Sequence, residues 1–419
     1  MKRPLSFAVI GCGSRGRTYM RIARGLGHRI AATADPSPTA LAAIEDIAGD
    51  PPPRSFETGE ALLAGPKLAD LAVITTQDAL HFPQAEAALR RGYDVLLEKP
   101  AAQTSGQTEQ LARIAAGEGR KLILCFVLRY TPFYRALKQA LDAGRIGDLV
   151  SMQASEGVGP WHQAHSFVRG HWSRTRESTP MIVAKCSHDT DLLAWIAGAG
   201  CRAVSSFARC SHFRPERAPE GATGRCTDGC PQLGRCRFDA HRYLGDQRRW
   251  LEMVRPDGAE MSDRQIIEWL RTSDWGRCAY RCGQDTPDHQ VVSMEFANGV
   301  TASLTMTAFD SGRRIRLYGT EGILEGALHA DGRDPWIECR AHEGTTEPVE
   351  IETPGDDGYA GHGGGDFGMM SALPALLEGE DADFIEGHRV AFAAAESVDT
   401  TSVITIGPPG PAAAGTDTR

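Results

Sequence analysis

The sequence predicts an α/β protein: an N-terminal Rossmann domain with a doubly wound parallel sheet, then an α+β domain with a large, mostly antiparallel sheet. Three observations lead to this prediction. Short apolar runs alternate with helical patterns up to about residue 126. The first run leads directly into a Gly-x-Gly-x-x-Gly turn. Farther along, Asn298-Gly299 lies between two β-rich runs, which is typical of an antiparallel hairpin.

In the first third, the expected strands are continuous apolar runs, as in a parallel sheet that is covered on both faces. They lie at residues 7–10, 30–34, 71–75, 94–97 and 121–126. Between them, apolar residues recur at helical spacing. The expected helices follow Gly16 and cover residues 39–48, 81–91 and 104–117. This strand–helix repetition implies parallel pairing through crossover connections.

Beyond residue 126 the pattern becomes that of an α+β domain. Helices are expected at residues 132–143, 181–196 and 367–377. Strands are expected at residues 149–154, 291–296, 301–306, 314–318 and 323–325. Asp366 is expected to cap the last helix, and the glycines between His362 and Asp366 indicate either a structural turn or a close approach to a ligand. Residues 406–419, rich in Pro, Gly and Ala, are expected to be disordered.

The glycine turn has the order of elements that a dinucleotide-binding site requires. Gly11 allows the tight turn, Gly13 lets a pyrophosphate approach the backbone, and Gly16 permits close packing of helix on strand. The helix that begins here, with Ser14 and Arg15 in its first turn, presents free N–H groups and the positive end of its dipole to phosphates. The turn therefore predicts a dinucleotide cofactor.

Asp35 ends the second apolar run, about twenty residues past the glycines. An acid at this position accepts hydrogen bonds from the adenosine ribose hydroxyls and repels a 2′-phosphate. We therefore expect NAD rather than NADP, although the nearby Arg15 keeps NADP open.

Lys99 follows the run at residues 94–97, within Glu98-Lys99-Pro100. The ends of parallel strands converge on the crevice where the cofactor binds, and the proline restricts Lys99 to extended geometry. Lys99 is therefore expected to face both the nicotinamide and a substrate hydroxyl. The alternative is a solvated lysine at the end of a buried strand.

Composition excludes several classes of function. A length of 419 residues predicts two domains, and a net charge of −9 argues against nucleic acid or an anionic membrane as the main ligand. No apolar run reaches 18 residues, so no membrane span is expected. Residues 1–4 leave no room for a leader before the first strand, which predicts a cytoplasmic protein.

Eleven cysteines are expected mainly as thiols or metal ligands in that compartment. Five of them lie in an insertion at about residues 210–285: Cys226, Cys230, Cys236, Cys278 and Cys282. Their spacings are C-x₃-C-x₅-C and C-x₃-C rather than the usual C-x₂-C pairs. A structural zinc or iron–sulfur site is one interpretation, and free thiols or a disulfide-pinned loop is the other.

Four motifs in this order resemble those of the Gfo/Idh/MocA oxidoreductase family, and the likeness runs from residue 5 to about residue 400. The motifs are the glycine turn at 11–16, the Thr75-Thr76-Gln77-Asp78 loop with His81, Glu98-Lys99-Pro100, and Ser187-His188-Asp189-Thr190-Asp191. The resemblance implies an NAD-binding Rossmann domain at 1–126 and a substrate and oligomerisation domain at 127–405. It also implies a homo-oligomer, dimer or tetramer, that acts on a secondary carbinol of a sugar, glycoside or cyclitol.

The resemblance also assigns site residues. By matching positions, Lys99 is the family's active-site lysine, His188 takes the place of its catalytic histidine, and Asp191 is the acid one helical turn later. This agrees with the chemistry, because hydride leaves a carbinol carbon only as the hydroxyl proton is withdrawn, and an ammonium stabilises the alkoxide. The expected cofactor-binding residues are Gly11, Gly13, Ser14, Arg15, Gly16, Asp35, Thr75, Thr76, His81, Glu98 and Lys99.

The chain departs from the family pattern four residues before His188. Many members carry an aspartate there, whereas this chain has Ala184 followed by Lys185. Either Lys185 or Asp189 takes over part of that role, or the chemistry differs. One alternative is an NAD-dependent relative that cleaves glycosides by oxidation, elimination and reduction. Another is a non-catalytic regulator that binds dinucleotide and sugar.

Residues 161–172 gather side chains that suit a sugar pocket, because aromatic faces stack on sugar C–H surfaces and Arg or His binds hydroxyls. The expected substrate-binding residues are Arg129, Tyr130, Trp161, His162, His165, Arg169, Trp172 and His188. The alternative for the 161–172 stretch is an aromatic-rich loop at a domain or subunit interface. A histidine metal site is less favoured, because no carboxylate spacing supports it.

Overall fold

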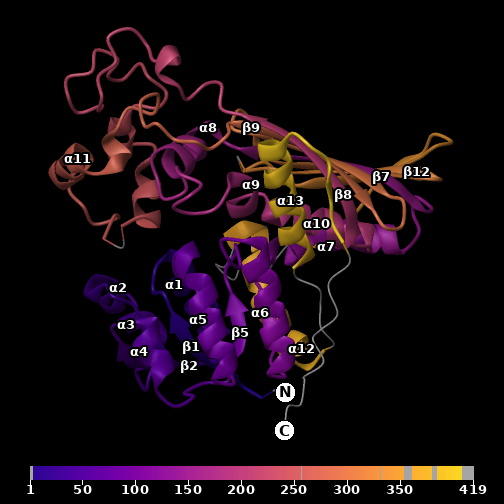
Figure 1. The fold of residues 1–419 in the computed structure, drawn as a ribbon, viewed down its shortest axis with the longest axis horizontal. Coiled ribbons are helices and arrows are strands. Elements are labelled where there is room, and N and C mark those ends of the chain that lie inside the picture. The colour runs from indigo at the N-terminus through magenta and orange to yellow at the C-terminus, as the bar shows by residue number, and fades with distance from the viewer. Residues whose placement is uncertain (1–2, 256, 331, 353–360, 380–384, 408–419) are drawn as a thin grey trace.

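Two sheets organise the protein, one in each domain (Figure 1). The structure is a computed structural model, and it describes residues 3–255, 257–330, 332–352, 361–379 and 385–407. The predicted α/β class, with a parallel first sheet and a mostly antiparallel second one, is confirmed. The predicted disorder of 406–419 falls almost wholly outside the described residues.

The first sheet has six strands in the order β3-β2-β1-β4-β5-β6, all parallel. The strands are β1 (Ser6–Ile10), β2 (Arg29–Ala34), β3 (Arg54–Phe56), β4 (Leu71–Ile74), β5 (Asp94–Leu97) and β6 (Leu122–Leu124). The order reverses between β1 and β4, so the loops after these two strands border the crevice where open α/β sheets bind ligands. The edge strand β3 was not predicted, because it is short and mostly exposed.

The helices around this sheet are α1 (Ser14–Gly25), α2 (Pro38–Ala42), α3 (Glu45–Ala48), α4 (Gly59–Ala64), α5 (Asp78–Arg90) and α6 (Ser105–Gly117). The single helix predicted at 39–48 is two short helices, α2 and α3, and α4 was not predicted. Apolar side chains of strands and helices form one core that runs through β1, β4 and β5.

The second sheet has nine strands in the order β14-β13-β12-β11-β7-β10-β9-β8-β15, and only the β7–β10 pair is parallel. Its strands are β7 (Leu149–Val158), β8 (Cys201–Arg209), β9 (His289–Phe296), β10 (Thr301–Thr307), β11 (Ser311–Gly319), β12 (Gly322–Leu328), β13 (Trp336–Ala341), β14 (Thr346–Pro348) and β15 (Ile404–Thr405). The predicted Asn298-Gly299 hairpin joins β9 and β10, with Gly299 at φ +86°. Strands β8, β13, β14 and β15 were not predicted.

Helices α7 (Pro132–Asp142), α9 (Met181–Ala184), α10 (Ser187–Ala197) and α13 (Glu386–Thr400) share the core of the second sheet (Figure 1). The single helix predicted at 181–196 is interrupted at Lys185–Cys186, which separates α9 from α10. Short helical segments are η1 (Val127–Tyr130), α8 (Pro160–His162), a π-helical turn (Gln163–Val168) and η7 (Gly361–Gly364). None of the helices in the described part of the chain is long and apolar enough to cross a bilayer.

The segment between β8 and β9 contains the predicted insertion. It holds α11 (Asp263–Thr272) and the short turns η3 (Pro215–Arg217), η4 (Ala240–Leu244), η5 (Arg248–Met253) and η6 (Asp274–Gly276). In Figure 1 it lies above the first domain and beside α8. Two small aromatic-rich clusters join it to residues 161–168.

Helix α12 (Gly365–Glu378) returns to the first domain late in the chain. Its Met369, Met370 and Leu373 are buried in the core of the first sheet, although the sequence placed this segment in the second domain. The N-terminal end of α12 thereby lies beside α1 and the cofactor turn.

Candidate functional site

The glycine turn has the geometry that a pyrophosphate needs. Gly11 has φ +94°, and a Cβ added there would lie 2.7 Å from the Thr75 carbonyl oxygen. At Gly16 an added Cβ would lie 2.0 Å from the Gly11 carbonyl oxygen. At Gly13 it would meet nothing within 4 Å, and no side chain caps the N-terminus of α1. Open space and uncapped N–H groups therefore coincide at Gly13, which fits the predicted dinucleotide.

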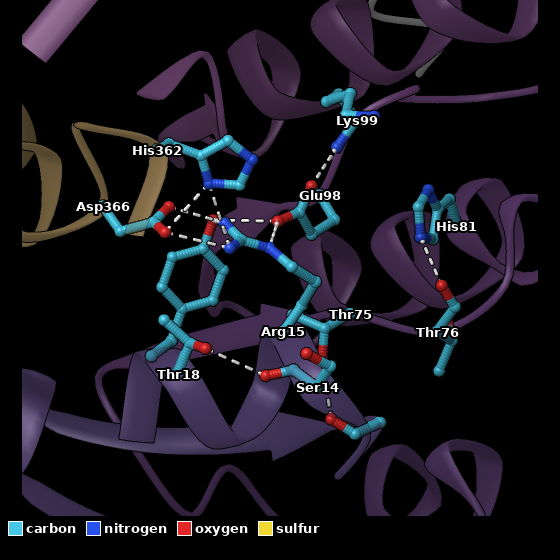
Figure 2. Close-up of polar contacts among 12 residues, drawn as sticks. Ser14, Arg15, Thr18, Thr75, Thr76, His81, Glu98, Lys99, His362 and Asp366 are labelled. Atoms are coloured by element: carbon cyan, nitrogen blue, oxygen red, sulfur yellow. Dashed lines mark hydrogen bonds and ion pairs between the residues drawn. The ribbon is translucent and has the colours of Figure 1, made fainter. Parts of the chain in front are cut away.

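The loops that flank this turn hold it in place. Thr75 donates from Oγ1 to the Gly11 carbonyl at 2.6 Å, and Thr76 donates to Gln84 Oε1 at 2.7 Å. His81 lies between two main-chain carbonyls, 2.6 Å from that of Pro100 and 3.0 Å from that of Thr76 (Figure 2). Thr75, Thr76 and His81, which the sequence predicted to bind the cofactor, are therefore held in place by these contacts beside the glycine turn.

Asp35 lies at the end of β2, beside the glycine turn. Its Oδ2 accepts from the Cys12 N–H and its Oδ1 from the Ser37 N–H, both at 2.8 Å. The carboxylate is therefore held in one orientation at the place where a ribose diol is expected, and each oxygen retains a second lone pair.

Arg15 points toward Glu98 and Asp366 (Figure 2). Its guanidinium donates to Glu98 Oε1 at 2.6 Å and to both oxygens of Asp366, at 2.7 and 3.0 Å. Tyr19 completes the cluster by donating to Glu98 at 2.9 Å. The sequence placed Arg15 near the phosphates, but two carboxylates, Glu98 and Asp366, pair with its charge. Burial tends to raise the pKa of Glu98, yet the charges of Arg15 and Lys99 outweigh this and keep it below its usual range.

The prediction that Asp366 caps α12 is wrong. Gly364 occupies the N-cap position without a side-chain hydrogen bond. The Asp366 carboxylate instead pairs with Arg15 and His362, and together with Glu98 it balances the charge of the largely buried guanidinium. Burial raises the pKa of Asp366, and the hydrogen bonds from His362 and Arg15 more than reverse this, so the pKa is held well below its ordinary value.

Lys99 reaches across to the second domain. Its Nζ donates to the main-chain carbonyl of Ala184 at 2.7 Å, at the C-terminal end of α9. Burial lowers the pKa of Lys99; Glu98 opposes this and the charge of Lys185 adds to it. The ammonium therefore lies between the cofactor crevice and α10, with a weakened hold on its proton.

His188 lies four residues after Ala184, in the first turn of α10, and is almost fully buried. Its ring packs against Phe126, with the centroids 5.9 Å apart, and its Nδ1 has no hydrogen-bond partner among the described residues. Burial, and then the charge of Lys99, hold the pKa of His188 well below 6.5. A neutral imidazole with an unpaired nitrogen beside an ammonium can accept a proton.

Lys185 and Asp189 belong to a buried network of four charges. Lys185 Nζ lies 2.8 Å from Glu156 Oε1. Arg313 pairs with Glu156 at 3.0 Å and with Asp189 at 2.7 Å. Neither Glu156 nor Arg313 was found from the sequence, because the strand that carries Glu156 was expected to end at Ala154. The network sets the orientation of the Lys185–Asp189 link between α9 and α10.

Two of the predicted site residues bind each other. Arg129 donates to both oxygens of Asp191, at 2.7 and 2.5 Å. In this bidentate pair Arg129 comes from η1, and Asp191 lies on α10, three residues after His188. Tyr130, next to Arg129, is partly buried, and burial raises its pKa to about 12.

Some side chains of residues 161–172 contact the insertion, and others lie closer to the candidate site. Trp161 packs on Tyr243, His165 lies 2.5 Å from the Tyr243 hydroxyl, and Arg169 donates to the carbonyls of Arg277 and Phe238. These three side chains are therefore held by partners in the insertion.

His162 and Trp172 lie nearer the crevice. Burial holds the pKa of His162 well below 6.5, and the charges of Lys185 and Lys99 lower it further. Trp172 Nε1 donates to Asp78 Oδ2 at 3.0 Å, at the start of α5. Trp172 lies at the boundary between the domains, where a cavity of about 380 Å³ is lined by Gln77, Asp78, His171, Trp172, Arg174 and Trp275, among others. The His162 ring packs on Trp250 of the insertion, with the centroids 4.9 Å apart.

The cysteines of the insertion are free thiols. Cys226, Cys230, Cys236 and Cys278 line one cavity of about 20 Å³. Within the described ranges, no three His, Cys, Asp or Glu side chains have the geometry to hold a metal. The Arg169 guanidinium lies 3.9 Å from the Cys226 sulfur, where it disfavours a second cation. Zinc at this cluster stays a prediction.

Comparison with known families matches both domains. A model described as an oxidoreductase family with an NAD-binding Rossmann fold matches residues 5–126, and a GFO/IDH/MocA C-terminal domain model matches residues 134–325. Together they cover most of the chain.

Among curated relatives, a Bacillus subtilis protein named as an oxidoreductase, YteT, is 26% identical over 323 residues, or 74% of this chain and 71% of its own length. Inositol 2-dehydrogenase of Streptomyces avermitilis is 30% identical over 225 residues, but these cover 53% of this chain and 60% of the relative.

Solved structures share the fold across nearly the whole chain. An oxidoreductase from Agrobacterium radiobacter, in complex with NAD⁺, L-tartaric acid and magnesium, has a TM-score of 0.68 at 16% identity and covers 96% of this chain and 98% of its own. An aldose-aldose oxidoreductase from Caulobacter crescentus has a TM-score of 0.65 at 17% identity, with coverage of 96% and 100%. At these identities the likeness establishes the fold alone.

Proposed function

This chain belongs to the Gfo/Idh/MocA family of NAD-binding oxidoreductases, and from that premise we propose that it moves a hydride between NAD and a secondary alcohol of a sugar or cyclitol. The observation that carries the proposal is the Lys99 ammonium, which is bonded to the Ala184 carbonyl at the end of α9, four residues before the buried, neutral His188 on α10. An acid and a base therefore lie together at the carboxyl end of β5.

The residues that would hold NAD are those of the turn and its flanks. The pyrophosphate would lie at Gly13, the ribose hydroxyls at Asp35, and the nicotinamide beyond Thr75 and Thr76 toward Lys99. The bound nicotinamide supplies the redox step by accepting or giving up the hydride.

The side chains supply the proton chemistry. In the oxidation direction, His188 takes the proton of the carbinol hydroxyl as the hydride leaves the same carbon. Lys99 donates a hydrogen bond to the developing alkoxide, and its partly buried position strengthens that contact. In reduction both roles reverse.

NAD is favoured over NADP on two grounds. The Asp35 carboxylate is held beside the turn by two N–H donors, where it would repel a 2′-phosphate. Arg15, the cation that kept NADP open, is committed to Glu98 and Asp366.

The substrate pocket is expected between the two domains. The cavity beside Asp78 and Trp172 offers an aromatic face and several hydrogen-bonding groups, as sugar sites do. His162 and the Arg129–Asp191 pair are the other candidates for contacts with substrate hydroxyls.

A homo-oligomer is expected to form through the second sheet. Phe207 on β8 and Val150 on β7 are 71% and 52% exposed, and Val291 on β9 is 41% exposed. Apolar side chains exposed together on one sheet favour association.

The decisive experiment is a screen of sugars, uronates, cyclitols and aryl glycosides with NAD, following both the absorbance of NADH and the release of aglycone. NADH formation with an alcohol substrate supports the proposal. Glycoside cleavage without net NADH would favour the redox-assisted alternative. Tight NAD binding without turnover of any substrate would favour the regulator.

A further inference from the structure

The loop before α12 holds a histidine in an unusual backbone conformation. His362 has φ +49° and ψ +41°, in the left-handed region that residues with a Cβ rarely adopt. Gly363 and Gly364 follow with φ of +63° and +86°. This run of left-handed residues turns the chain so that His362 lies beside the start of its own helix, toward Lys99 and Glu98 in Figure 2.

Asp366 fixes one nitrogen of this ring. His362 Nδ1 lies 3.0 Å from Asp366 Oδ2, and the same carboxylate accepts two bonds from Arg15. Arg15 Nη1 lies farther from the same nitrogen, at 3.4 Å, so the closer carboxylate, which only accepts, favours the hydrogen on Nδ1. The neutral ring then has its free lone pair on Nε2, and no described residue provides a partner for that nitrogen.

The ring also lies close to the buried base. The centroids of His362 and His188 are 6.1 Å apart, with the planes inclined at 49°. The two differ sharply in exposure: His188 is 4% exposed, and the side chain of His362 is 42% exposed. His362 therefore contacts both the interior of the site and solvent.

The proposed oxidation creates a need for such a group. Each turnover converts an alcohol and NAD⁺ into a ketone, NADH and one proton, and that proton is left on His188, which is shielded from water. His188 must lose it before the next turnover.

We propose that His362 is the proton shuttle of the site, passing protons between His188 and solvent, with Asp366 as its positioning residue. This rests on the proposed dehydrogenase function. His188 gives its proton to Nε2 of neutral His362, which becomes an imidazolium stabilised by Asp366. Nε2 then releases that proton to water or buffer. The charged and titratable groups around the path are Asp366, Arg15, His188 and Lys99.

The kinetic test compares His362→Ala with wild type in dilute and concentrated imidazole buffer. Steady-state kcat of the variant should fall about tenfold or more in dilute buffer, and added imidazole should restore it in a saturable way, because a free imidazole replaces the shuttle. NADH formation in the first turnover should stay within about twofold, because hydride transfer precedes the release of the proton. His342→Ala, which removes another exposed histidine, is the matched control.

Three results would overturn the proposal: wild-type kcat in dilute buffer, a loss that imidazole does not restore, or an equal loss in the first turnover. The last of these would make His362 part of the chemical step itself. His362→Gln, which keeps a polar side chain but carries no exchangeable ring proton, should behave as the alanine variant does.

A second measurement does not depend on activity. ¹⁵N NMR of histidine side chains, assigned through His362→Ala, should show neutral His362 with its hydrogen on Nδ1. A hydrogen on Nε2 would contradict the proposal. If no alcohol substrate is found, the proposed function fails while this measurement still decides the position of the proton.

Discussion

Lys99 and Ala184 are joined by a hydrogen bond of 2.7 Å between the lysine Nζ and the alanine carbonyl oxygen. Ala184 stands where the family pattern often has an aspartate, so a main-chain carbonyl takes the place of a carboxylate as the partner of the ammonium. A neutral partner stabilises the charged lysine less than an anion would. The lysine is thereby tied to α9, the short helix that precedes the one carrying His188.

The chemistry should depend on both members of this pair. Lys99→Ala or His188→Ala should lower kcat by about a hundredfold or more, the usual scale for loss of an acid–base group or a charge stabiliser. The Kd for NAD should change far less, because the glycine turn holds the phosphates. Steady-state kinetics and calorimetric titration with NAD check this, with Lys67→Ala and His342→Ala as controls. A variant with near-wild-type turnover would remove that residue from the mechanism.

The pH profile should show both shifted groups. Since burial and Lys99 lower the pKa of His188, it stays neutral until the pH falls well below 6.5, and kcat/KM for oxidation should decline only there. Since burial lowers the pKa of Lys99, the alkaline decline should begin below pH 10.5. Lys99→Arg should move the alkaline limb upward, because the guanidinium stays charged. An acid limb centred at or above pH 7 would contradict the assignment of His188 as base.

Cofactor choice should follow Asp35. Asp35→Ser should weaken NAD binding and improve NADP binding, because it removes both the acceptor for the ribose diol and the charge that repels a 2′-phosphate. Dissociation constants for both cofactors decide this. Asp46→Ser, which removes one carboxylate from α3, is the matched control. Tighter binding of NADP than NAD by the wild type would refute it.

Alanine substitutions at two glycines of the turn should have different effects, one on stability and the other on NAD affinity. In Gly16→Ala the Cβ would lie 2.0 Å from a main-chain oxygen, so the protein should lose about 1–3 kcal/mol of unfolding free energy. In Gly13→Ala the Cβ enters open space, so stability should stay within about 0.5 kcal/mol. The Kd for NAD should nevertheless rise at least about tenfold, since the methyl group occupies the phosphate position. Equal NAD affinity in Gly13→Ala would place the pyrophosphate elsewhere.

Stoichiometry separates the two enzyme mechanisms. With a glycoside substrate and limiting NAD, a dehydrogenase should form one NADH for each product molecule. A redox-assisted glycosidase regenerates NAD in each cycle and accumulates no NADH. We expect the first result, from quantifying product and NADH in the same samples. Many turnovers per NAD would establish the second mechanism.

Much of the first domain could be predicted from local pattern. Continuous apolar runs identified β1, β2, β4 and β5, because a parallel sheet covered on both faces needs apolar strands. The glycine turn predicted the position of the cofactor crevice. The short edge strand β3 and the short strand β14 at the edge of the other sheet escaped prediction, because exposed edges carry no such pattern.

The sequence by itself determined the Rossmann fold, the family and the candidate residues Lys99, His188 and Asp35, since periodicity and motif spacing are local properties. Only the tertiary structure decided which charges are paired. Arg15 and Asp366 are 351 positions apart, yet they form one buried ion pair, and no local pattern records that contact. The same holds for Arg313 with Asp189, and for the turn of chain that places His362 beside His188. Long-range packing selects these partners, because a buried charge must find its counter-charge wherever the fold brings one.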